Sequence, residues 1–132
     1  MILSCSPQIT QQSIALVVAF MSEFFINKDV TAVNRYVGES YVQHNPMVGN
    51  GKASLVELFR QAPSIEYTPG GVVGNCDIVM VYGRYSGLGA QPSVGVDIFR
   101  VANGWIVEHW DVLQTEVPAS QTASGNPMFT SL

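Results

Sequence analysis

The hydrophobic pattern of the chain changes at Pro63 from helical to strand-like spacing. Before Pro63, residues 6–27 carry apolar side chains on most sides of a helix, and residues 52–62 place Leu55, Leu58 and Phe59 at helical spacing. Four runs after it are typical of strands, at residues 64–73, 77–87, 92–101 and 105–114. Helices followed by strands predict an α+β fold, with helices packed on one face of a mostly antiparallel sheet.

The region between the two long predicted helices contains more local signals. Asp29 is a plausible N-cap for a short helix that ends near Val37, with Gly38 after it. Residues 39–51, "ESYVQHNPMVGNG", are punctuated by Asn-Pro and Gly-Asn-Gly and predict a structured loop. The apolar run at residues 14–26 is shorter than a membrane span and contains Glu23, so we expect a buried helix there and no membrane as partner.

Composition limits the classes of partner. The 132 residues are 47% hydrophobic and 12% charged, which predicts one domain over residues 1–132 with a substantial core. Residues 115–132 form a polar tail whose "NPMF" segment could anchor its end on a surface. A net charge of -4 without a basic patch argues against nucleic acid as partner. With so few charges to cover the surface, we expect a homodimer.

The two cysteines do not form a metal-ligand or redox motif. Cys5 and Cys76 lie far apart in the sequence, without a CxxC spacing. We therefore expect two free thiols in a reducing compartment, and a cytoplasmic protein.

The last predicted hairpin, "DIFRVANGWIVEHWDVLQ", contains ionisable side chains among large apolar ones. If residues 102–104 form a three-residue loop, Val101 pairs with Trp105 and Asp97 lies opposite His109. Five side chains then share one face, namely Asp97, Phe99, Val107, His109 and Asp111.

A second register is possible if only Asn103-Gly104 makes the turn. Ala102 then pairs with Trp105, Asp97 lies opposite Trp110, and the polar cluster breaks up. We favour the first register because it places an acid opposite a histidine. In that register the polar face could still look either into water or into a cavity under the helices.

Three segments in this order resemble a known family: "YVQHNPMV", "VDIFRVANGWIVEHWDVLQ" and "SGNPMF". They are similar to the SnoaL-like polyketide cyclases of the NTF2-like superfamily, and the resemblance covers nearly the whole chain. It implies a cone-shaped α+β fold in which a curved sheet and the N-terminal helices enclose a deep pocket. The polar groups of the last two strands would then point into that pocket. The same fold hosts cyclases, isomerases, dehydratases, hydrolases and binding proteins, so the resemblance leaves the reaction open.

The resemblance also implies roles for individual residues. Asp111 matches the position of the catalytic acid or base of the SnoaL-type cyclases, and Asp97 resembles the oxyanion-side hydrogen-bond donor of ketosteroid isomerases. His44 matches a pocket-lining histidine. Relatives often carry a histidine in the strand that here reads "VMVYGRYSG", so we expect a differently shaped or charged pocket. Further residues expected to bind substrate are Phe20, Phe24, Tyr41, Phe59, Tyr82, Arg84 and Phe99.

These residues predict acid/base chemistry. A carboxylate in an apolar cavity is harder to ionise, so it can exchange protons near neutral pH. We expect Asp111 to remove a proton next to a carbonyl group of a small hydrophobic molecule. Asp97, His109 and His44 are the candidates for donating a hydrogen bond to the enolate oxygen. Cyclisation or isomerisation would follow, without a cofactor or metal. The alternatives are a binding or dimerisation module without turnover, and a dehydratase or epoxide hydrolase.

Overall fold

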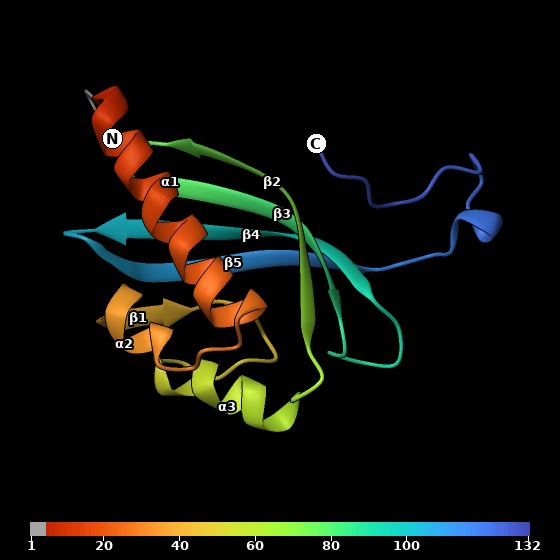
Figure 1. Ribbon diagram of the computed structural model, residues 1–132, viewed down its shortest axis with the longest axis horizontal. Helices are drawn as coiled ribbons and strands as arrows, with labels where there is room; N and C mark the ends of the chain where they lie inside the picture. The colour runs from red at the N-terminus through yellow and green to blue at the C-terminus, as the bar shows by residue number, and fades with distance from the viewer. Residues whose placement is uncertain (1–4) are drawn as a thin grey trace.

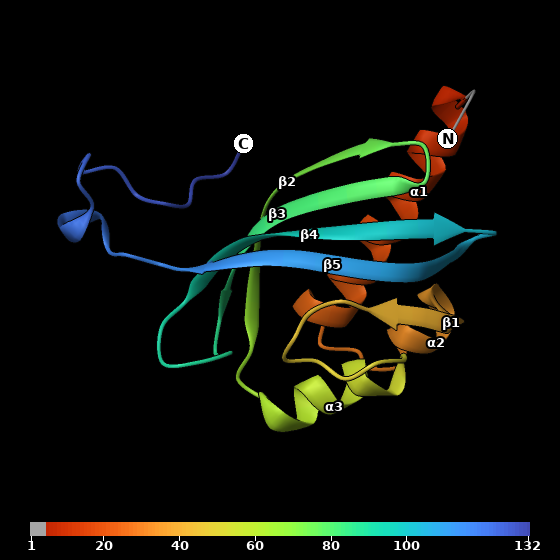
Figure 2. The ribbon, with the colours of Figure 1, turned by 180° about the vertical axis from the view of Figure 1, so that it is seen from behind.

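The sheet is curved and has five strands in the order β1-β5-β4-β3-β2. The computed structural model describes residues 5–132. Strands β2 (Glu66–Asn75), β3 (Ile78–Ser86), β4 (Ser93–Ala102) and β5 (Trp105–Thr115) form an antiparallel meander. Strand β1 (Val37–Gln43) pairs in parallel with β5 at one edge. The α+β architecture expected from the sequence is therefore confirmed, and Figure 2 shows the meander from its open side.

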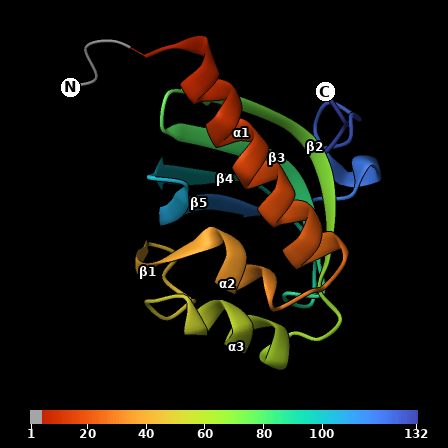
Figure 3. The same cartoon turned by 60° about the vertical axis from the view of Figure 1, so that its left-hand side comes forward.

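Helices α1, α2 and α3 all lie on the concave side of the sheet (Figures 1 and 3). Helix α1 (Pro7–Met21) continues as a π-helical turn, η1 (Ser22–Ile26), and crosses the strands diagonally. Helices α2 (Ala32–Tyr36) and α3 (Ala53–Gln61) lie near the β1 edge. All three predicted helices are confirmed, with shorter bounds for α2.

Local chemistry explains where α1 begins and how it packs. Pro7 occupies the first turn, and the Ser6 hydroxyl accepts a hydrogen bond from the Ile9 amide at 3.2 Å. One face of the helix, with Val17 and Phe20, is buried against the sheet. By length and composition, Pro7–Ile26 is apolar enough to cross a membrane, with 20 residues and a mean hydropathy of 1.5. In this structure the helix is part of the core.

Residues 39–43 were expected to belong to a loop, and that expectation is wrong. Together with Val37 and Gly38 they form β1, which pairs with β5 through Val37 opposite Ile106 and Gln43 opposite His109. The pairing partner lies more than 60 residues away, so no local hairpin signal announces this strand. The loop expected there begins only after Gln43.

The two cysteines are bonded to each other. Cys5 and Cys76 form a disulfide that joins the start of the chain to the β2–β3 turn, with their Cα atoms 5.5 Å apart. The expectation of two free thiols is therefore wrong. Disulfides are typical of oxidising compartments. The cytoplasmic location stays a prediction, which fractionation of the producing cells would test.

The C-terminal segment leaves the sheet after β5 and returns to its outer surface. It contains one short 3₁₀ turn, η2 (Ala119–Gln121), and extends away from the body of the domain (Figure 1). Its end is attached at two points. The Phe129 ring lies 5.3 Å from that of Tyr82, and the Leu132 amide donates to the Gly70 carbonyl at 2.8 Å. The "NPMF" segment thus does anchor the tail.

Candidate functional site

A cavity of about 690 Å³ lies between the concave side of the sheet and helices α1 and α3. This volume is in the range of small-molecule binding sites. Most of the lining is apolar, with Phe20 and Phe25 from the first helix and Leu55 and Leu58 from α3. Polar side chains of β4, β5 and the end of β1 form one part of the wall. The described lining residues include no lysine and no arginine.

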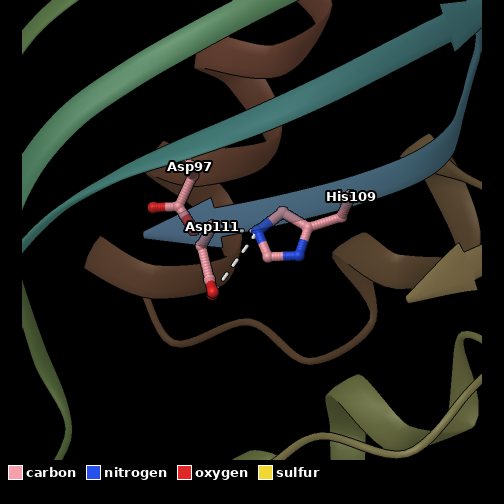
Figure 4. A group of neighbouring side chains, drawn as sticks. All are labelled: Asp97, His109 and Asp111. Atoms are coloured by element: carbon pink, nitrogen blue, oxygen red, sulfur yellow. Dashed lines mark hydrogen bonds and ion pairs between the residues drawn. The ribbon is translucent and has the colours of Figure 1, made fainter. Parts of the chain in front are cut away.

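Asp97, His109 and Asp111 meet in this wall, as Figure 4 shows. Asp97 pairs with Asp111 across β4 and β5, and Phe99 pairs with His109. Asp97 is 4% exposed and His109 is 7% exposed. The alternative in which these groups face water is therefore wrong.

Neither expected register of the hairpin is correct in full. Only Asn103 and Gly104 make the turn, both with positive φ (52° and 81°), so Ala102 pairs with Trp105. A bulge then leaves Val107 without a partner between the Val101–Ile106 and Arg100–Glu108 pairs. The bulge moves Ile106 into the core, where it is 0% exposed, and brings the acids and the histidine back onto one face.

The Asp97 carboxylate accepts hydrogen bonds on both oxygens. The Tyr85 hydroxyl donates to Oδ2 at 2.6 Å, and His109 Nε2 lies 2.8 Å from Oδ1. Burial and the neighbouring Asp97 charge raise the pKa of Tyr85 well above its usual value, so this hydroxyl keeps its proton. Asp97 therefore orients His109, and the role of hydrogen-bond donor expected for it does not fit these contacts. Tyr85 belongs to the strand in which relatives were expected to carry a histidine.

Asp111 has one oxygen held by the protein and one open to the cavity. Asn45 Nδ2 donates to Oδ2 at 2.6 Å, and His109 Nε2 lies 4.0 Å from the same oxygen. The other oxygen, Oδ1, makes no hydrogen bond. Among the described residues, the one side-chain polar atom that is both fully buried and unpaired is Asp77 Oδ1, so Asp111 Oδ1 is not fully buried and is exposed to the cavity that Asp111 lines. Burial raises the pKa of Asp111 and the charge of Asp97 raises it further, against the Asn45 hydrogen bond and the His109 charge, which lower it.

Three alternate residues, Tyr41 and Gln43 of β1 and Asn45 just after it, line the cavity and connect to this cluster. Gln43 Oε1 lies 2.6 Å from His109 Nδ1, and Gln43 Nε2 donates to the Tyr41 hydroxyl at 3.0 Å. Burial raises the pKa of Tyr41, and the charges of Asp97 and Asp111 raise it further. The Tyr41 hydroxyl thus keeps its proton, for which no acceptor is present in the described part of the protein.

Sequence reasoning missed Gln43 and Asn45 as site residues. The signal available was the two-residue period of a strand, counted from Tyr41. The segment was interpreted as a loop, and His44, which lies between them, was chosen from the family resemblance.

His44 lies on the outer face of the sheet, contrary to expectation. Its Nε2 lies 2.7 Å from a Glu108 carboxylate oxygen, and its ring stacks on Trp110 with centroids 5.0 Å apart. Its backbone amide still donates to the His109 carbonyl at 2.9 Å, which holds β1 to β5.

The aromatic and basic residues expected to bind substrate divide into three groups. Phe20, Tyr41 and Phe99 line the cavity. Phe24 and Phe59 lie behind its wall in the core, with ring centroids 4.8 Å apart. Tyr82 and Arg84 point to the outer face, where Tyr82 contacts the tail and Arg84 pairs with Glu116. Neither of the last two groups contacts the cavity. For Tyr82 and Arg84 the reason is strand alternation, which directs Tyr85 inward from that part of β3.

Distances alone would allow a metal ion here. One ligand atom each from Asp97, His109 and Asp111 lies within 4.8 Å of the other two. The histidine nitrogen nearest both carboxylates is, however, already bonded to Asp97. We therefore assign no metal to these side chains.

A curved sheet with helices on its concave side and a polar cluster in the enclosed cavity defines the NTF2-like class of proteins. The family model for the SnoaL-like domain matches residues 17–109, and the chain belongs to this family. No curated protein sequence matches the chain.

Solved structures support the same fold at low sequence identity. A candidate SnoaL-like polyketide cyclase from Jannaschia sp. CCS1 is similar with a TM-score of 0.68 and 18% identity, over 84% of this chain and 90% of that one. A candidate ketosteroid isomerase from Kribbella flavida DSM 17836 is similar with a TM-score of 0.68 and 17% identity, over 80% of this chain and 79% of that one. An LEH-like epoxide hydrolase from M. tuberculosis is similar with a TM-score of 0.66 and 18% identity, over 80% of this chain and 84% of that one. The solved structures therefore support the same fold as the family model, while their names give different activities.

Proposed function

We propose that the protein is a cofactor-independent acid/base enzyme for a small, uncharged, hydrophobic carbonyl compound. The observation that carries this proposal is that two polar groups in the cavity wall have hydrogen-bonding capacity left for a ligand. One is the Asp111 oxygen without a hydrogen bond, and the other is the Tyr41 hydroxyl proton without an acceptor. Such a pair supplies a base and an oxyanion donor in one apolar site.

In the proposed reaction, Asp111 removes a proton from the carbon next to the carbonyl group. The electron pair of the broken C–H bond moves to the carbonyl oxygen, and the Tyr41 hydroxyl donates a hydrogen bond to the resulting enolate. Asp111 then returns the proton to another carbon, which gives an isomer. Alternatively, the enolate carbon attacks a second carbonyl of the same molecule, and the new alkoxide takes the proton, which gives a ring.

Tyr41 takes the donor role for which Asp97, His109 and His44 were the candidates. Asp97 is occupied as an acceptor, His109 lies between Asp97 and Gln43, and His44 is outside the cavity. The absence of lysine and arginine from the described lining supports an uncharged substrate, since an anionic group would meet two carboxylates and only His109, which is already paired with Asp97.

Deuterium incorporation tests this proposal without knowledge of the natural product. The protein is incubated in D₂O with a panel of uncharged aromatic and bicyclic ketones, and exchange next to the carbonyl is followed by mass spectrometry. We expect exchange with at least one ketone, slowed by about 100-fold in Tyr41→Phe. Binding of several ketones without any exchange would overturn the proposal and favour a ligand-binding module.

A second candidate, epoxide hydrolysis, uses the same groups. Asn45 and Asp111 converge within 2.6 Å and could together orient a water molecule, while Tyr41 would donate to the epoxide oxygen. Product analysis in ¹⁸O water separates the reactions, because a diol gains one labelled oxygen from solvent whereas isomerisation and cyclisation gain none.

We also propose a homodimer formed through the outer face of the sheet. Val73, Met80, Ile98 and Trp110 are aligned across four strands of this face, beside Val112, which is 70% exposed. Sedimentation at micromolar concentration should give a dimer that Val112→Glu dissociates. Val56→Glu, a matched change at an exposed position of α3, should leave it intact. A wild-type monomer would contradict this proposal.

A further inference from the structure

We propose that Gln43 is a positioning residue that holds His109 as a doubly protonated imidazolium in the cavity wall. The assignment of charge to His109 follows from hydrogen-bond geometry and from the ordinary basicities of the imidazole and carboxyl groups. Its value for catalysis rests on the proposed function of Asp111 as a base.

The orientation of the Gln43 side-chain amide is fixed by the backbone. The Asn45 backbone N–H lies 3.0 Å from Gln43 Oε1, and a backbone N–H can only donate. Oxygen must therefore occupy this position. The amide nitrogen on the other side donates to the Tyr41 hydroxyl at 3.0 Å. A rotated amide would place an N–H group against the Asn45 N–H.

The fixed amide oxygen determines one proton on His109. Gln43 Oε1 lies 2.6 Å from His109 Nδ1 and can only accept, so Nδ1 carries a hydrogen. On the other side, His109 Nε2 lies 2.8 Å from Asp97 Oδ1. A hydrogen on this nitrogen as well makes the ring a cation with two charge-assisted hydrogen bonds.

The proton between Asp97 and His109 is placed on the histidine by two arguments. A model imidazole is more basic than a model carboxylate by about 2.5 pKa units. The Tyr85 hydroxyl also donates to the second Asp97 oxygen at 2.6 Å, which favours the ionised carboxylate.

The other groups around the ring agree with a cation. Asp111 of β5 approaches Nε2 at 4.0 Å, and Tyr41 of β1 and Tyr85 of β3 are neutral hydroxyls. The Phe99 ring lies 4.9 Å from the His109 ring, and α1 contributes the apolar Phe20 to this wall. Two carboxylates thus face the histidine, and no basic side chain among the described lining residues opposes its charge.

The positive charge of His109 affects the pKa of Asp111, the proposed base. Burial and Asp97 raise the pKa of Asp111, whereas the His109 charge lowers it. With Gln43 in place, Asp111 therefore stays ionised to a lower pH than its burial alone would allow. Gln43 would act on Asp111 through His109, without touching substrate in this role.

Imidazole ¹⁵N NMR on the full-length protein tests the inference without a ligand. The two nitrogens of an imidazolium give nearly equal shifts, while the bare nitrogen of a neutral ring moves far downfield. The chain has two histidines, so His44→Gln assigns both signals. We expect His109 of the wild type to show the imidazolium pattern at neutral pH. A neutral pattern there would overturn the inference.

Two variants of Gln43 should move the signal in opposite directions. Gln43→Leu removes the acceptor, so the His109 imidazolium should be lost at a lower pH than in the wild type. Gln43→Glu keeps an acceptor and adds a negative charge, so the imidazolium should persist to a higher pH. A role in packing alone would not give opposite signs, and equal shifts in both variants would refute the inference.

The design separates this inference from the proposed function. If Gln43→Leu does not fold, as judged by circular dichroism, the wild type and Gln43→Glu still decide the question. A failure to exchange ketone protons would leave the NMR result standing. The ¹³C signal of the Asp111 carboxyl tests the link to the base. Asp111 should take up its proton at a higher pH in Gln43→Leu than in the wild type, and an unchanged titration would refute the link.

Discussion

Two histidine–carboxylate pairs lie on opposite faces of the same part of the sheet. His109 and Asp97 are 2.8 Å apart on the inner face, and their side chains are 9% and 6% exposed. His44 and Glu108 are 2.7 Å apart on the outer face, where the exposed fractions are 42% and 25%. The two contacts are almost equal in length and composition, so the difference between them is the environment.

The comparison teaches that burial, rather than the presence of a nearby histidine, prepares a carboxylate for proton transfer. On the outer face, the hydrogen bond from His44 and the neighbouring Arg100 hold the pKa of Glu108 below its usual value. On the inner face, Asp111 lies beside the buried pair, 4.0 Å from His109 Nε2, and burial raises its pKa. A carboxyl group with a raised pKa binds a proton more readily near neutral pH, which suits a base that must also return it.

The largest expected effect is on turnover. Asp111→Asn should reduce ketone exchange by at least about 100-fold, because the amide cannot accept the proton. Glu108→Gln, the matched change on the outer face, should leave exchange unchanged. Isotope exchange rates and circular dichroism of both variants provide the measurement. A fully active, folded Asp111→Asn protein would exclude Asp111 as the base.

The next effect is on stability. Asp97→Asn removes the negative charge beside buried His109 and should lower the free energy of unfolding by about 3 kcal/mol at pH 5. The loss should be smaller at pH 8, because a histidine of the unfolded chain is then mostly neutral and the variant can fold without burying an unpaired charge. Urea denaturation at both pH values measures this. A loss that is independent of pH would indicate that only packing had changed.

The contributions of Asp111 on the inner face and Glu108 on the outer face to folding stability should change with pH in opposite directions. The folded-state pKa of Asp111 is raised, so its proton stabilises the fold at low pH, and this contribution is lost as the pH rises through that raised value. The folded-state pKa of Glu108 is lowered, so its contribution is present above the unfolded-state pKa and is lost as the pH falls through the folded-state value.

Variants make this difference measurable. As the pH rises from 3 to 7, the stability of the wild type should fall relative to Asp111→Asn and rise relative to Glu108→Gln. Thermal denaturation across this pH range would show the two trends. Parallel trends would mean that the two carboxylates share one environment.

The sequence predicted the fold class, the helices and the inner position of Asp97, His109 and Asp111, because these follow from local periodicity and a family pattern. It could not predict how the hairpin reaches that arrangement. A bulge at Val107 combines the two-residue turn of one register with the polar cluster of the other. A bulge adds a single residue without a characteristic sequence signal here.

The missed residues have a common cause. Gln43 and Asn45 are amides in a segment rich in turn-forming residues. Strand β1, which ends at Gln43, forms only because it pairs with the distant β5. Parallel pairing between segments so far apart needs no hairpin turn, so the two-residue period counted from Tyr41 was the one local signal for this strand. The Cys5–Cys76 disulfide is likewise a contact between distant segments.

The smallest effect is expected for His44→Gln, which removes only the outer histidine ring. Exposed pairs contribute about 0–1 kcal/mol, and 0.5 M salt should screen most of this contribution. The strand contact should survive, because it is the His44 backbone amide that donates to the His109 carbonyl. Unfolding free energies at low and high salt, together with the ketone exchange rate, measure the change. If His44→Gln destabilised the protein as much as Asp97→Asn does, or slowed exchange, burial would not be what distinguishes the two pairs.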